Sequence, residues 1–97
     1  MPEPSLLVRR FVRILLYQLE RDGRFTTFAV NLNPKAEKVE IGAEVLGEVG
    51  EPLCATLAVT WAEIDLSAMP LIQLARRAVL GIEAKMDQWR EEQGRPR

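Results

Sequence analysis

The sequence contains no histidine and only one cysteine, Cys54. Histidine is the side chain that most often transfers protons near neutral pH and the commonest metal ligand, so a Ser–His–Asp triad and most metal sites are excluded. Cys54 also lacks the histidine that would hold its thiolate. One cysteine cannot form an internal disulfide, so we expect a cytoplasmic protein rather than a disulfide-framed secreted domain. These absences argue against an enzyme.

Long apolar runs and nucleotide-binding motifs are missing too. Arg9, Arg10 and Arg13 interrupt the first apolar segment, which rules out the uninterrupted core of a signal peptide. A membrane span needs about 20 apolar residues, and no stretch of the chain approaches that length. The glycines fit neither GxGxxG nor a P-loop. We therefore predict no membrane association and no cofactor.

What the chain does contain is the composition of one soluble domain. Its 97 residues are 47% hydrophobic and 28% charged, which is enough apolar material for a core and too short a chain for two domains. We predict a single domain over 1–97, with an extended lead-in at 1–4 and a disordered tail at 94–97. No internal repeat is present.

The first element is predicted to be a helix over 6–22. Ser5 is placed to cap it, and Gly23 to end it, since a glycine adopts the left-handed conformation that commonly follows a helix. Its apolar residues cover more than one stripe, so we expect it to bury two sides.

Three segments then show the alternating pattern of β-strands, at 25–32, 39–46 and about 53–64. The second alternates most regularly, with acidic residues on its outer side. In the third strand, which on this pattern includes Trp61 on its core side, the opposite side is small and uncharged. With a helix at each end, the sequence predicts an α+β fold of order α-β-β-β-α: a three-stranded antiparallel meander with both helices packed on one face.

The last helix is predicted over 68–93, capped by Asp65 or Ser67. At about 1.5 Å per residue it would be about 39 Å long, against about 26 Å for an eight-residue strand. Met86 and Trp89 would lie on the overhang, either exposed or packed against a second copy. Together with the small face of the third strand, at Cys54, Thr56 and Ala58, this predicts a homodimer.

Charge is segregated along the chain although the net charge is only -1. Residues 5–24 hold five arginines against two acidic residues, whereas 25–66 hold seven acidic residues against two lysines. If the two helices are neighbours, the clusters Arg9, Arg10, Arg13 and Arg76, Arg77 would merge into one patch for phosphates. A solvated helix face is the simpler interpretation, because the aromatic residues that stack on bases are few.

Three functions therefore stay open. The favoured one is a small non-catalytic protein, homodimeric and binding an unidentified protein partner. The second is a nucleic-acid-associated protein that uses the arginine patch. The third is an enzyme with a pocket that gathers Glu63, Asp65 and an arginine, since paired carboxylates transfer protons or hold hard cations. No residue pattern predicts a metal site strongly enough to be preferred.

Overall fold

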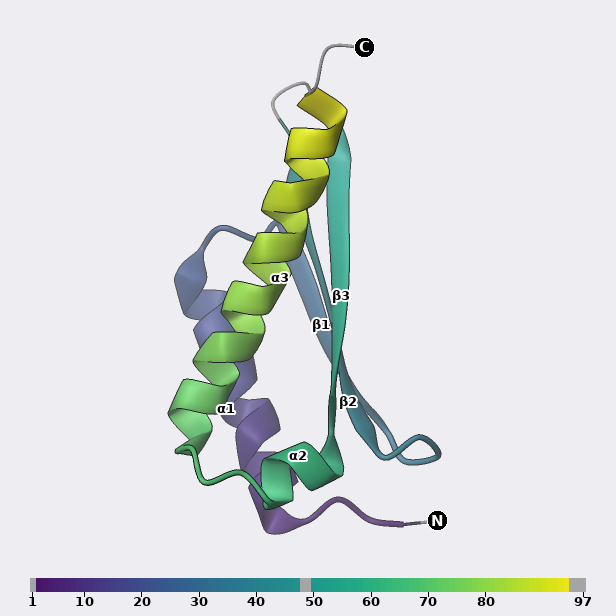
Figure 1. The fold of residues 1–97 in the computed structure, drawn as a ribbon, viewed down its shortest axis with the longest axis vertical. Helices are drawn as coiled ribbons and strands as arrows, with labels where there is room; N and C mark the ends of the chain where they lie inside the picture. The colour runs from purple at the N-terminus through teal and green to yellow at the C-terminus, as the bar shows by residue number, and fades with distance from the viewer. Residues whose placement is uncertain (1, 48–49, 95–97) are drawn as a thin grey trace.

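The computed structural model describes residues 2–47 and 50–94, and Figure 1 shows how they are arranged. The elements are α1 (Leu6–Asp22), β1 (Thr27–Asn33), β2 (Lys38–Leu46), β3 (Pro52–Thr60), α2 (Trp61–Asp65) and α3 (Leu71–Gly94). The strands form an antiparallel sheet in the order β1-β2-β3, and α1 and α3 pack against each other on one face of it. The predicted α+β meander with its helices on one face is confirmed.

Helix α1 begins and ends at the predicted residues. The Ser5 hydroxyl accepts a hydrogen bond from the Val8 N–H at 3.2 Å, which satisfies one of the free donors of the first turn. Gly23 has a φ of 70°, the left-handed conformation that a residue without a Cβ adopts at no steric cost. Phe11 and Leu15 are among its fully buried side chains, so α1 supplies a large part of the core.

The central strand β2 fixes both the register and the two faces of the sheet. Ile41 lies opposite Val30 of β1 and Leu57 of β3, and it is buried beneath the helices. Its neighbours in sequence alternate as predicted: Val39 and Ala43 are buried on the same side as Ile41, whereas Glu40 and Gly42 face outward. An alternating strand of this kind is typical of an antiparallel sheet that is covered on one face only.

The third strand ends earlier than predicted, at Thr60 rather than near Ile64. The Thr60 hydroxyl accepts a hydrogen bond from the Glu63 N–H, and the Glu63 carboxylate accepts one from the Thr60 N–H at 2.8 Å. This reciprocal pair is a capping box, and it starts α2 at Trp61. Trp61 is buried in the core as expected, but from a helix and not from the core side of a strand. The sequence prediction missed α2.

The last helix begins at Leu71, directly after Pro70, and neither predicted cap is used. Asp65 instead accepts a hydrogen bond from the Ser5 hydroxyl at 2.5 Å, which ties the start of α1 to the end of α2. The Ser67 hydroxyl accepts from the Met69 N–H at 3.0 Å inside the connecting loop. At the other end α3 includes Gly94, the first residue of the predicted tail, and 95–97 lie outside the described residues.

The predicted overhang of the last helix is wrong at Met86, which is only 1% exposed and belongs to the core. The helix is two residues shorter than predicted, and β2 and β3 each have nine residues where the estimate assumed eight: 24 residues of helix span about 36 Å, and nine residues of strand span about 30 Å. The sheet therefore reaches under Met86. Within the described ranges, no helix is long and apolar enough to cross a membrane.

Candidate interaction surface

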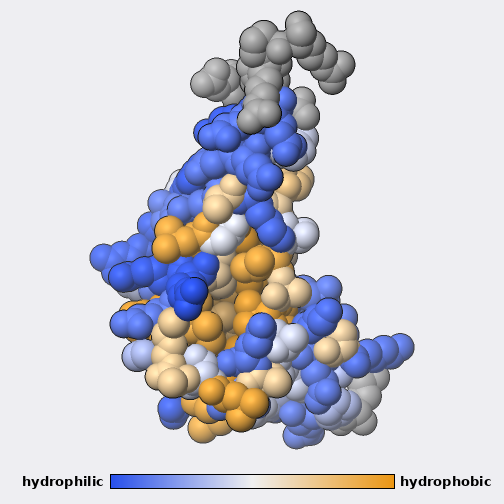
Figure 2. Space-filling view, viewed as in Figure 1, coloured by the Kyte–Doolittle hydropathy of each residue, from blue (hydrophilic) through white to orange (hydrophobic). Residues whose placement is uncertain are grey.

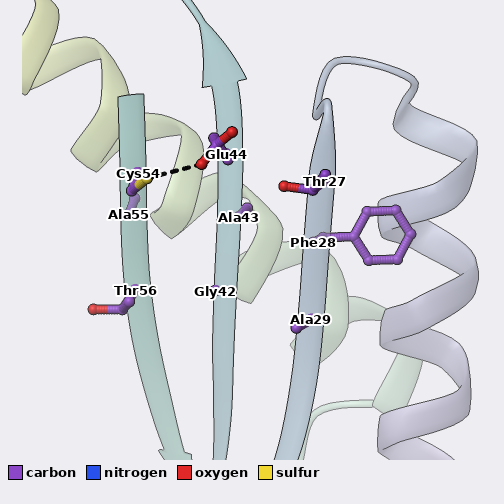
Figure 3. Close-up of a pocket in the computed structure, with 9 residues that line it drawn as sticks. All are labelled: Thr27, Phe28, Ala29, Gly42, Ala43, Glu44, Cys54, Ala55 and Thr56. Atoms are coloured by element: carbon purple, nitrogen blue, oxygen red, sulfur yellow. Dashed lines mark hydrogen bonds between the residues drawn. The ribbon is translucent and has the colours of Figure 1, made fainter. Parts of the chain in front are cut away.

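The outer face of the sheet, opposite the helices, carries the predicted small side chains. Figure 3 views a shallow hollow of about 290 Å³ on this sheet, lined by Thr27, Phe28, Ala29, Gly42, Ala43, Glu44, Cys54, Ala55 and Thr56. Cys54, Thr56 and Ala58 are exposed, as their alternation with buried Leu53 and Ala55 predicts. The small floor is therefore accessible to a partner.

Cys54 is the only thiol of the chain, and its environment keeps it protonated. Its sulfur donates a hydrogen bond to the Glu44 carboxylate at 3.3 Å across the β2–β3 pair (Figure 3). This hydrogen bond, with smaller contributions from desolvation and from the negative charge of Glu44, raises the pKa of the Cys54 thiol above its ordinary value. Because the thiolate is the reactive form, Cys54 is a poor nucleophile.

Among the residues that the structure describes, backbone N–H groups on the edge of β3 have no hydrogen-bond partner. The Trp61 N–H donates a hydrogen bond to the carbonyl of Glu37, the residue before β2, at 2.9 Å. The Thr60 N–H points away from β2 and donates to the Glu63 carboxylate. In an antiparallel pair, successive residues point their N–H and C=O groups alternately toward and away from the neighbouring strand. Cys54, Thr56 and Ala58 therefore direct these groups away from β2, to the open edge.

One side chain from α3 reaches this edge. The Lys85 ammonium donates a hydrogen bond to the Thr56 carbonyl oxygen at 2.5 Å. The contact confirms that the Thr56 carbonyl faces outward, and Figure 3 shows the Thr56 side chain at the outer margin of the sheet, directed away from β2. A lysine beside an edge strand is a common device against uncontrolled strand pairing.

A second hollow lies beside the same edge, on the helix side. Its volume is about 330 Å³, and it is lined by Leu57, Ala58, Val59, Glu63, Leu74, Arg77 and Ala78. Figure 2 shows apolar surface exposed in this region, between α3 and β3. The edge of β3 is therefore bordered by small side chains on the outer face and by an apolar strip on the helix face.

The two predicted dimer contacts on α3 differ in their placement. Met86 is buried within its own chain and is unavailable to a second copy, so the expectation that it contacts a partner is wrong. Trp89 is 41% exposed. It follows Lys85 by four residues and thus lies on the same flank of the helix, which is the flank that faces the β3 edge.

The five arginines of the predicted phosphate patch are all exposed, and they are divided between α1 and α3, two helices that pack against each other. Arg9, Arg10 and Arg13 occupy the face of α1 opposite its buried residues. Arg77 lines the hollow beside β3, whereas Arg76, one residue earlier, is rotated by about 100° around the helix. Within the described residues, none of the five forms an ion pair.

The predicted acidic pocket is divided between two places. Glu63 caps α2 and lines the hollow beside β3, together with Arg77. Asp65 lines a different hollow, of about 480 Å³, with Ser5, Glu37 and Trp61. The described residues contain no cluster of carboxylates and thiols suited to a metal ion. The structure therefore does not gather Glu63 and Asp65 with an arginine.

Sequence reasoning missed a cluster of charged residues around Arg24. The guanidinium lies 2.6 Å from the Asp87 carboxylate and 3.7 Å from that of Glu83, both on α3. Desolvation raises the pKa of Glu83, assisted by a hydrogen bond to Asp22 and partly offset by the charge of Arg24. The i,i+4 spacing of Glu83 and Asp87 signals a shared helix face, but only the fold brings Arg24 to it.

Comparison with known proteins adds no analogy to this geometry: no family model, no curated protein and no solved structure matches the chain.

Proposed function

We propose that this chain is a small, non-catalytic, homodimeric protein–protein interaction module. The observation that carries the proposal is the β3 edge, where Cys54, Thr56 and Ala58 direct their backbone groups away from β2 beside an apolar hollow, and where the Thr56 carbonyl is held by the Lys85 side chain. An edge of this kind is a template for pairing with another strand. The proposal also places the module in the cytoplasm, where a single thiol stays reduced.

A non-catalytic role is supported by the chemistry that the chain offers. Histidine is absent, Cys54 is held protonated beside Glu44, and Glu63 is engaged in a capping box. An active site needs a positioned acid, base or nucleophile with a pKa suited to its task. The exposed small outer face of the sheet fits contact with another protein better than it fits the enclosure of a small substrate.

The experiment is sedimentation equilibrium of the full chain over a wide range of concentrations. We expect a species of twice the mass of one chain at tens of micromolar, dissociating on dilution. A monomer throughout that range would contradict the homodimer.

The alternative function is nucleic-acid binding, and it depends on one observation: Arg9, Arg10 and Arg13 lie exposed on one face of α1. It predicts binding to duplex DNA or RNA at low salt that weakens steeply as salt is added, because phosphate contacts release counterions. Arg9→Ala combined with Arg13→Ala would abolish such binding, whereas Arg77→Ala, on the β3 side of α3, would change it little. Absence of binding at low salt would dismiss this alternative.

A further inference from the structure

The homodimer proposed above requires an interface, and the β3 edge is the candidate that the structure defines best. We infer that two copies of this chain pair their β3 strands antiparallel about a two-fold axis at Thr56, which joins the two sheets into one of six strands. This inference rests on the proposed function.

The two ends of the open edge determine the register of this pairing. Pro52, at the start of β3, has no N–H to donate, and the Thr60 N–H at its end is already bonded to Glu63. Only Cys54, Thr56 and Ala58 between them direct both a free donor and an acceptor outward. Antiparallel pairing centred on Thr56 sets Cys54 opposite Ala58 of the second copy and uses all of these groups, in about six backbone hydrogen bonds.

A second copy fits this edge because the edge is complementary to itself. No residue of β3 is charged, so the two paired strands place no like charges of their own opposite each other. The outward side chains of Cys54, Thr56 and Ala58 are small, and a two-fold axis at Thr56 also places the apolar strip at Leu57 and Val59 beside its own copy. Burial of apolar side chains of this size adds to the main-chain pairing.

The other edge of the sheet is less suited to this role. The β1 edge lies next to α1, and the ring of Phe28 extends from β1 toward that helix (Figure 3). Of the side chains within 2–47 and 50–94, the Lys85 ammonium, on a flexible stem, is the one that hydrogen-bonds to the β3 edge. The Thr56 carbonyl has two lone pairs, so it can accept from the second copy when Lys85 shares it or swings away.

Disulfide trapping in the full chain tests the register directly. In a Cys54→Ala background, Thr56→Cys places the two thiols on the two-fold axis, where the Cα atoms of a hydrogen-bonded pair lie about 5.5 Å apart, within the range that a disulfide spans. We expect a covalent dimer after mild oxidation. The matched control is Ala29→Cys in the same background, an exposed position on the outer side of β1, and we expect it to form no covalent dimer.

A second trap uses the native thiol. Ala58→Cys alone should give a dimer with two disulfides, each joining Cys54 of one copy to the new thiol of the other. Within one chain these positions are four strand residues apart, about 13 Å, so they cannot react with each other. A single-linked dimer, or equal trapping at the Ala29 control, would overturn the register.

Loss of pairing is tested with Thr56→Pro and its matched control Thr56→Val, which keeps the N–H. Because this N–H faces away from β2, proline is tolerated in the folded chain but removes two hydrogen bonds from the dimer. We expect the dissociation constant of the dimer to rise by roughly 10- to 100-fold for Thr56→Pro and to change little for Thr56→Val. If Thr56→Pro prevents folding, the disulfide traps at Thr56 and Ala58 test the β3 interface by themselves.

The outcomes separate this inference from the proposed function. A chain that is monomeric by sedimentation refutes both. A chain that is dimeric but is not trapped through Thr56→Cys refutes only the β3 interface, and trapping through Val30→Cys instead would place the interface at the β1 edge.

Discussion

Replacing Met86 by alanine tests whether this residue serves the core of its own chain. Met86 is 1% exposed and packs in the main hydrophobic cluster, so its removal leaves a cavity. Truncations of this kind cost about 2–5 kcal/mol, while a domain of this length is stable by roughly 5–15 kcal/mol in total. We expect Met86→Ala to lower the free energy of unfolding by about 3 kcal/mol and the melting temperature by roughly 10–25 °C.

The measurement is urea unfolding followed by far-ultraviolet circular dichroism, with both variants at one protein concentration so that dimerisation contributes equally. The control is Leu80→Ala on the same helix, where the leucine is 54% exposed and the expected loss is below about 1 kcal/mol. A loss for Met86→Ala no larger than for Leu80→Ala would refute the assignment of Met86 to the core. A loss that vanished on dilution would place Met86 at an interface after all.

Two further predictions concern the perturbed pKa values. The pKa of Glu83 is raised in the folded state, so its contribution to stability is complete below the unfolded value of roughly 4.3 and is lost as pH rises through the folded pKa. The free energy of unfolding of Glu83→Gln, relative to that of the natural chain, should therefore increase from about pH 4 upward and then level off. Urea unfolding at a series of pH values measures this difference. A difference that does not change with pH would contradict the prediction. The pKa of the Cys54 thiol is raised by Glu44, so Glu44→Gln should speed its alkylation by iodoacetamide at mildly alkaline pH, whereas Glu40→Gln on the same strand should not. Equal rates in all three proteins would show that Glu44 does not control the thiol.

Local sequence signals predicted most of the elements correctly. Ser5 and Gly23 bound α1 because a cap and a left-handed glycine act within a few residues of the helix end. The two faces of β2 follow from strict alternation, which leaves one register that buries the apolar side. The start of α2 could also have been predicted from the sequence, since Thr60 and Glu63 have the spacing of a capping box. The alternation that continues through Trp61 favoured a strand there, and the local hydrogen bonds prevailed.

What the sequence alone determined is the α+β class, the faces of the strands and the lack of histidine beside a single thiol, because each depends on residue type and short-range spacing. Only the tertiary structure decided that Met86 is buried, since this depends on how far the sheet extends beneath α3. It also decided that Arg77 lines the hollow beside β3 and that Arg24 meets Glu83 and Asp87. The open edge at Thr56 is likewise a property of strand order, because a strand has a free edge only when no other strand lies beside it.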